Sequence, residues 1–280
     1  MSKKSNSIPL IALVLLTVIT FFVSMAVGRY NVSFSSLIGF FTGRKIDSVS
    51  YNILLYLRLP RTLVSILIGI SLSVSGAIYQ SSFRNKLVSP DLLGVSSGAS
   101  VGACLAILLG LSNIFINLFS FVLGLVAVLL TLSFSKLMKN QSTIVLLLSG
   151  IAMSGLMSSF VGLLKYLADN EMKLAEMTFW LLGDISGTTI KDVYIMLPIT
   201  LICCIMVLLL SWRLNVISLG EGDAKSLGLN YKTTLAVFII MATFLTAGAV
   251  SISGTIGWIG LVIPNIVRLI VGNDNRKVMP

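Results

Sequence analysis

The stretch IPLIALVLLTVITFFVSMAV, residues 8–27, carries no charged side chain over its whole length. A helix needs about 20 apolar residues to cross a hydrocarbon core of ~30 Å. This stretch alone therefore predicts a membrane-spanning helix. It is longer than the ~7–15-residue apolar region of a signal peptide and runs directly into Arg29, which favours an uncleaved first helix.

The rest of the chain repeats this pattern. Of its 280 residues 56% are hydrophobic and only 11% are charged, whereas soluble domains have about 25% charged residues, so a water-soluble globule is excluded. No apolar run alternates like the strand of a membrane barrel. We expect an all-α, polytopic membrane helix bundle with eight spans, at residues 8–27, 63–79, 92–111, 114–135, 143–164, 193–212, 235–252 and 256–271.

Several kinds of chemistry are missing from the sequence. There is no histidine, and Cys104, Cys203 and Cys204 all lie inside apolar runs, where cysteine is a small core residue. We therefore expect no catalytic residues, no metal site and no cofactor, and so no enzyme. The net charge of +10 is scattered over the loops between spans, which indicates membrane topology and not nucleic-acid binding.

The distribution of Lys and Arg favours an N-terminus in the cytoplasm. That orientation places more basic residues inside than outside, Lys3 and Lys4 among them, and puts the long loop 213–234 on the inner face. The outer segments are then 29–57, which shows no strong helix signal, and 165–192, where MTFWLLGDISG predicts a short helix ended by Gly187. Basic residues in segment 29–61 do not fit the topology rule, which suggests another role for them.

The source of energy for transport is expected to lie on another chain. No acidic residue falls inside a span, and neither a charged ring nor a filter loop is evident, which disfavours an ion-coupled carrier or a channel. Residues 220–226 lack the Gly-Lys-Ser/Thr ending of a phosphate loop. The small residues Gly220, Gly222, Ala224 and Gly228 instead predict a pair of short helices on which a separate ATPase docks.

Glycines at helical spacing predict close helix packing. Gly94, Gly98 and Gly102 form two consecutive GxxxG steps, and Gly69 and Gly76 flank Ser73 in the preceding span.

Four stretches together resemble one family. These are RLPRTLVSILIGISLSVSGAIYQSSFRNKLVSPDLLGVSSGASVGA (58–103), FWLLGD (179–184), SLGEGDAKSLGLN (218–230) and GTIGWIGLVIPNIVRLIVGNDNRKVMP (254–280). They resemble FecCD-type permeases, the membrane subunits of bacterial ABC importers. The resemblance implies a type II importer permease with about ten spans, so residues 1–280 are expected to be a single permease domain that lacks the last two family helices.

The resemblance also implies partners and site residues. A permease homodimer or paralogous heterodimer would work with two cytoplasmic ABC ATPase subunits and an extracytoplasmic substrate-binding protein. Arg58 and Arg61 of RLPR match the arginines that pair with carboxylates of the binding protein. The loop that couples to the ATPase is matched by Ser218, Leu219, Gly220, Glu221, Asp223, Ala224, Leu227 and Gly228.

The function implied by the resemblance is import of iron–siderophore complexes across the bacterial cytoplasmic membrane. Haem and cobalamin are alternative substrates, while an ATP-independent carrier and an inactive truncated remnant are weaker readings. Asn265 and Asn275 stand where relatives usually have histidine, so a role that needs a charged imidazole is in doubt.

Overall fold

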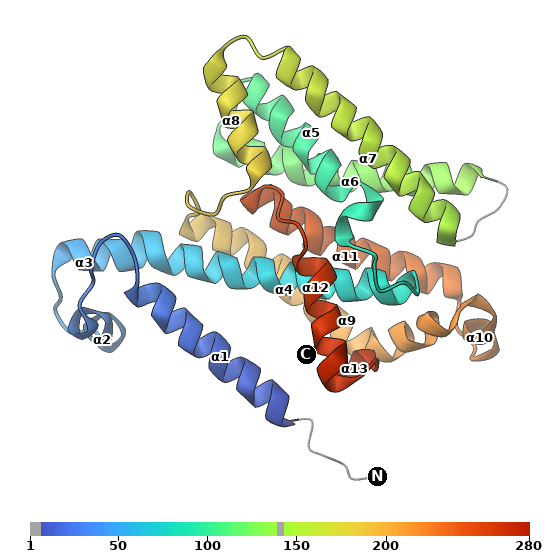
Figure 1. The fold of residues 1–280 in the computed structure, drawn as a ribbon, viewed down its shortest axis with the longest axis horizontal. Coiled ribbons are helices and arrows are strands. Elements are labelled where there is room, and N and C mark those ends of the chain that lie inside the picture. The colour runs from blue at the N-terminus through green and yellow to red at the C-terminus, as the bar shows by residue number, and fades with distance from the viewer. Residues whose placement is uncertain (1–6, 139–142) are drawn as a thin grey trace. The chain divides into compact units, whose positions relative to one another are not determined.

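The structure, a computed structural model, describes residues 7–138 and 143–280, and these residues form helices without any strand. The basic residues Lys3, Lys4 and Lys139 lie outside the described part. Figure 1 labels the elements along the chain. They are α1 (Ser7–Ala26), α2 (Phe34–Thr42), α3 (Ser48–Asn52), η1 (Ile53–Arg58), α4 (Leu59–Ser82), η2 (Pro90–Leu93), α5 (Val95–Leu108), α6 (Asn113–Leu137), α7 (Thr143–Tyr166), α8 (Glu171–Leu182), α9 (Ile190–Leu219), α10 (Glu221–Ser226), α11 (Tyr231–Ser253), α12 (Ile259–Val271) and α13 (Asn275–Val278).

Each of the eight expected spans corresponds to an apolar helix, and within residues 7–138 and 143–280 five of these helices are long enough to cross a membrane by length and composition. The helix that contains α4 starts at Ser48 and is the longest, and α6, α7, α9 and α11 are the others. The apolar part of α1 is shorter, and α5 and α12 have 14 and 13 residues. At 1.5 Å per residue these two helices are only about 20 Å long, less than a hydrocarbon core of ~30 Å.

Backbone geometry explains why α5 and α12 are shorter than the apolar runs that predicted them. Pro90–Leu93 form a 3₁₀ turn that ends at Gly94, whose φ of 84° is left-handed, so α5 cannot begin before Val95. The chain leaves α11 at Gly254 (φ 68°), and Trp258 (φ 69°) precedes α12. Hydropathy alone does not register such breaks, because the broken segments remain apolar.

The backbone contacts divide the chain into two compact units, and the expectation of a single permease domain over residues 1–280 stays a prediction. The first comprises Met1–Leu67 and Ile185–Ile195, and the second Ile68–Asp184 and Met196–Pro280.

The first unit holds helices in a segment that showed no strong helix signal. Ser33 and Asp47 cap the starts of α2 and α3 by accepting hydrogen bonds from the backbone N–H groups of Ser36 and Ser50. A small core of Met25, Leu37 and Leu54 lies beneath them. Capping and this packing, and not a continuous apolar run, therefore form these short helices.

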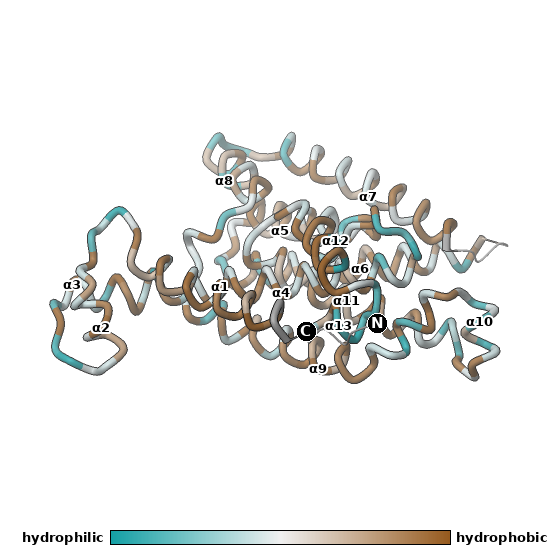
Figure 2. Tube along the Cα trace, turned by 60° about the horizontal axis from the view of Figure 1, so that its bottom comes forward, coloured by the Kyte–Doolittle hydropathy of each residue, from teal (hydrophilic) through white to brown (hydrophobic). Residues whose placement is uncertain are grey.

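The second unit is built around α4, α5 and α11. The side chains of Tyr79, Phe238 and Leu245 are fully buried in its core. Hydroxyl groups connect α4 to α11 inside this core, since Ser75 Oγ lies 2.6 Å from Thr246 Oγ1 and Tyr79 Oη lies 3.1 Å from Thr243 Oγ1. Such bonds satisfy polar groups that neither lipid nor protein would otherwise solvate. Figure 2 shows hydrophobic residues along α6, α7 and α9, with hydrophilic ones gathered in connecting segments.

Candidate functional site

The segment between α9 and α11 forms one short helix, α10, where the sequence predicts two. Gly220 precedes it with φ 119°, a conformation that favours glycine. Ala224 is fully buried in the core of the second unit, and its carbonyl accepts a hydrogen bond from the Leu229 N–H at 3.0 Å. Asn230 then caps α11 by accepting from the Thr233 N–H. The segment is therefore fixed to the core from beneath.

Five of the eight residues expected to couple to an ATPase are exposed on α10 and its flanks. Leu219 and Leu227 are 55% and 54% exposed. Glu221 forms an ion pair with Lys225 at 2.8 Å, and the hydrogen bond from Lys225 lowers the pKa of Glu221. We call the set Leu219, Glu221, Asp223, Leu227 and Gly228 the coupling surface.

The other three expected residues hold the segment in place and do not face outward. Gly220 and Ala224 are buried, so neither offers a side chain to a partner. Ser218 is half-buried, and its hydroxyl donates to the carbonyl of Asn215 at 2.6 Å. Ala224 was expected to contact an ATPase because of its small size; its burial shows that the size serves packing within the chain.

The two arginines of the RLPR motif differ in exposure. Arg58 is 9% exposed, and its guanidinium donates to the carbonyls of Met25 at 2.7 Å, Ala26 at 2.8 Å and Tyr30. It thereby satisfies carbonyls at the end of α1. Arg61 is exposed and donates to the carbonyl of Ser186 at 2.6 Å. Of these two arginines only Arg61 presents its charge at the surface of the first unit, so it is the one available for docking.

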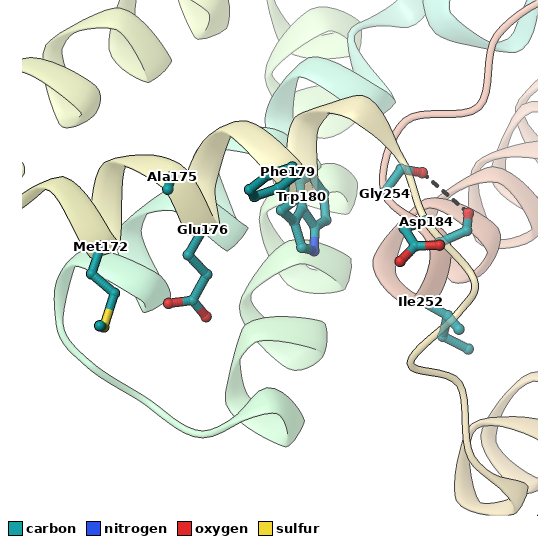
Figure 3. A pocket seen from close by; sticks show the side chains of 9 residues that line it. Met172, Ala175, Glu176, Phe179, Trp180, Asp184, Ile252 and Gly254 are labelled. Carbon is teal, nitrogen blue, oxygen red and sulfur yellow. Dashed lines mark hydrogen bonds between the residues drawn. The ribbon is translucent and has the colours of Figure 1, made fainter. Parts of the chain in front are cut away.

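A hollow of about 540 Å³ lies at the opposite end of α11 from α10 (Figure 3). It is bordered by α8, which runs from Glu171 to Leu182 and ends at Gly183, earlier than the expected Gly187. The Asp184 N–H donates to the Ser253 carbonyl at 2.8 Å, which holds the end of α8 against the end of α11. The lining consists of Met172, Ala175, Glu176, Phe179, Trp180, Asp184, Ile252, Ser253 and Gly254. It combines aromatic and thioether groups with two carboxylates and has no basic residue.

The glycines expected to pack helices fall into two groups. At Gly76, Gly98 and Gly102 the backbone of another segment is very close. A Cβ on Gly98 would lie 2.6 Å from the Leu123 carbonyl oxygen of α6, and one on Gly76 would lie 2.8 Å from the Cα of Gly260. These positions leave no room for a larger residue.

Gly94 and Gly69 differ from that expectation. A Cβ on Gly94 would make only ordinary van der Waals contacts, the nearest at 3.5 Å. Glycine suits this position because the backbone φ is positive. Among the described residues no heavy atom lies within 4 Å of a Cβ on Gly69, so the expected packing contact within the chain is absent there. Gly69 was predicted to pack closely because Gly69, Ser73 and Gly76 recur at helical spacing. Close packing is present at Gly76, against Gly260, but not at Gly69.

Arg268 lies in the last turn of α12 and is buried. A basic residue near the end of an apolar run is expected to extend to the membrane surface, yet Arg268 is 8% exposed. Its guanidinium donates to Gln80 and Ser81 of α4. Sequence reasoning missed these α4 partners because they carry no charge, and their place in the motif 58–103 does not identify Arg268 as the side chain that they bind.

Known proteins with similar sequences are import permeases. The molybdate import system permease protein MolB of Haemophilus influenzae is 37% identical, over 97% of this chain and 82% of that protein. A probable iron chelatin transport system permease protein of Helicobacter pylori is 38% identical, over 86% of this chain and 72% of its own length. The hemin transport system permease protein HmuU of Yersinia pestis is 33% identical, over 96% of this chain and 80% of that protein.

A solved structure has the same fold. It is described as a metal-chelate type ABC transporter in an inward-facing conformation, and it matches with a TM-score of 0.88 and 36% identity over 97% of this chain and 84% of the other. The helices, their order and the short α10 between two long apolar helices thus define a multi-pass permease of the type II importer fold. The model of the FecCD transport family matches residues 16–280. The chain belongs to this family of ABC transporter permeases.

Proposed function

We propose that the chain is the permease subunit of a binding-protein-dependent ABC importer that moves iron–siderophore complexes across the cytoplasmic membrane. ATP is hydrolysed by separate subunits. The coupling surface carries the proposal, because α10 presents two exposed acidic residues between two exposed leucines on a segment anchored to the core by Ala224. An N-terminus in the cytoplasm puts this surface on the side where ATP is available.

In this proposal the chain works as one half of a permease dimer, either with a copy of itself or with a paralogue. ATP binding closes the ATPase pair and moves both α10 segments, and the dimer opens its central cavity to one side and then to the other. A rigid ferric chelate needs a wide route, which a cavity between two bundles provides more easily than a single bundle.

The outer face of the proposed complex receives the substrate-binding protein. Arg61 is exposed in the first unit, as are Arg29, Arg44 and Lys45. The planar guanidinium of arginine binds carboxylates through two parallel hydrogen bonds. Acidic residues on the binding protein are therefore the expected partners of this basic segment.

The lining of the hollow supports an organic chelate as the substrate. Phe179 and Trp180 offer aromatic surface to a large organic ligand, an interaction that a small oxyanion such as molybdate would not use. We place the hollow on the outer side of the route. Haem and cobalamin are also large organic metal complexes and remain the alternatives.

Uptake by cells tests the substrate. Cells lacking this gene are complemented with the full chain and supplied with labelled ferric siderophores, haem, cobalamin or molybdate. We expect uptake of one siderophore class to be restored. Restored uptake of molybdate alone would contradict the proposed substrate, and uptake that persists after ATP depletion would contradict the proposed class of transporter.

A substitution on α10 tests the ATPase partner. Leu227→Glu places a charge on the coupling surface without touching the core, so we expect co-purification of the ATPase to fall about tenfold while the permease remains in the membrane. Leu167→Glu is the matched control, since Leu167 is also about half exposed and follows α7 at the proposed outer end. Equal co-purification of the ATPase with both variants would contradict the role of α10.

A further inference from the structure

Asn215 connects the last turns of α9 to the segment that begins α13. Its side-chain Nδ2 donates to Asp274 Oδ1 at 2.6 Å, and its Oδ1 accepts a hydrogen bond from the Asn275 backbone N–H at 2.8 Å. Both ends of the amide are therefore used on two consecutive residues. Asn215 lies four residues before Leu219, the first residue of the coupling surface.

From Asn275 the hydrogen bonds continue into α4. Asn275 is 2% exposed, and its Oδ1 accepts from the Ser81 hydroxyl at 2.9 Å. Ser81 Oγ also accepts from Arg268 Nη2 at 3.1 Å, and Arg268 donates to Gln80 Oε1 as well. Gln80 Nε2 donates to the carbonyl of Leu261 in α12 at 3.1 Å. One unbroken series of bonds thus joins α9, α13, α4 and α12.

The charge buried among these bonds is the guanidinium of Arg268. Arg268 forms no ion pair with any carboxylate of the described residues, and its partners are the neutral groups of Gln80, Ser81 and the Ala77 carbonyl at 3.3 Å. A guanidinium away from water is costly unless its donors are satisfied. Sliding α12 along α4 would break these bonds together, so the two helices are expected to move as one body.

Among the described residues, a second polar connection runs from the base of α10 toward the end of α4. Arg84 Nη1, just past the end of α4, lies 3.5 Å from the carbonyl of Leu219, at the limit for a hydrogen bond. The pair of bonds from Asn215 is shorter and leads to buried groups. Asn215 therefore adds a polar connection to the packing of Ala224 in the core, and it links the end of α9 that carries the coupling surface to Asp274 and Asn275.

We infer that Asn215 is a positioning residue that transmits the movement of the α10 segment to the paired helices α4 and α12. This inference rests on the proposed function, because it gives the path by which an ATPase bound at the coupling surface would drive the permease core. Asn215 itself is only half-buried and belongs to the part of α9 that precedes the coupling surface, so it need not touch the ATPase.

The test measures transport per ATP hydrolysed by the reconstituted permease–ATPase complex with its binding protein. For Asn215→Ala we expect unchanged co-purification of the ATPase, ATP hydrolysis close to that of the original chain, and about a tenfold fall in substrate transported per ATP. Asn265→Ala is the matched control. That asparagine also donates two hydrogen bonds, to the carbonyls of Lys86 and Leu261, but has none to α9 or α13, and its ratio should not change.

If Asn215→Ala folds poorly, a second test exchanges the side chains of Asn215 and Asp274. Asn215→Asp sets a carboxylate against that of Asp274, and we expect the ratio to fall as it does for the alanine variant. Adding Asp274→Asn restores a donor and an acceptor at this contact, which should bring the ratio back to within about threefold of the original value.

An unchanged ratio in Asn215→Ala, or no recovery in the double variant, would overturn the inference. An original chain that transports its substrate without binding an ATPase would overturn the proposed function and the inference with it. In that case co-purification fails before any variant is compared, which distinguishes the two failures.

Discussion

Two buried guanidinium groups, those of Arg58 and Arg268, have neutral oxygen atoms as partners. Arg58 binds carbonyls at and just after the end of α1, where the helix dipole is negative, and Arg268 binds side chains and a carbonyl of α4. Neither forms an ion pair with a carboxylate within the described ranges. A motif of two arginines separated by Leu and Pro could be recognised in the sequence, but only the coordinates show that one of the two is structural.

Replacing Arg58 tests that distinction. Arg58→Met removes three hydrogen bonds and leaves buried carbonyls without donors, so we expect the free energy of unfolding in detergent to fall by about 2–4 kcal/mol. Arg61→Met loses one exposed bond and should change it by less than about 1 kcal/mol. Similar unfolding free energies for the two variants would contradict the structural role of Arg58.

Asp274 predicts a pH dependence of stability. Hydrogen bonds from Arg276, and then from Asn215, hold the pKa of Asp274 at about 2, below its ordinary value of 3.8. A lowered pKa means that the ionised form stabilises the fold above pH 4, and that this contribution disappears as the pH falls from 4 through 2. Thermal unfolding should therefore show Asp274→Asn to be less stable than the original chain at pH 7, with the difference closing near pH 2. A difference that is the same at both pH values would contradict this role.

At the scale of helices, apolar runs located all eight apolar helices but not their ends. The run 92–111 contains α5, yet Gly94 delays the helix until Val95, and the run 256–271 similarly begins before α12. Helices α2 and α3 were missed because their stability comes from capping residues and the contact with Met25. Local hydropathy predicts which segments lie in the membrane, but it carries no information on φ angles or on contacts between residues distant in sequence.

Contact between α5 and α6 gives a prediction at this scale. In Gly98→Leu the new Cβ would meet the backbone oxygen of Leu123, so the helices must separate, and we expect a loss of folded protein in detergent. Gly155→Leu in α7 is the control, because no described heavy atom lies within 4 Å of its Cβ position. Equal yields of monodisperse protein from both variants would count against close packing of α5 on α6.

At the scale of the whole molecule, the sequence sufficed for the family, while the role of the coupling surface stays a prediction. The long motifs of the sequence kept their order along the chain, and α10 lies where one of them predicts a docking segment. The hollow beside α8 could not be predicted, because it is formed by residues 172–184 and 252–254, which are far apart in sequence. It lies about 35 Å from α10, the length of the 23 residues of α11.

Docking of the binding protein is the prediction for the assembled transporter. Arg61→Glu reverses an exposed charge in the first unit, and we expect weaker binding of the partner at low salt. Screening weakens the original contact as salt rises, so the difference in affinity between the two chains should shrink. Arg84→Glu changes a basic residue at the proposed inner side and serves as the control for net charge. An affinity that is the same for Arg61→Glu and the original chain at low salt would remove Arg61 from the docking site.

The burial of Arg268 has a consequence for how the protein is made. An unpaired charge in a helix that enters the bilayer costs free energy during insertion. Gln80 and Ser81, which accept hydrogen bonds from that charge, leave the ribosome more than 180 residues earlier. When α12 emerges, its acceptors are already in the membrane, and the order of synthesis thereby gives the last apolar helix of the described chain a prepared place to insert.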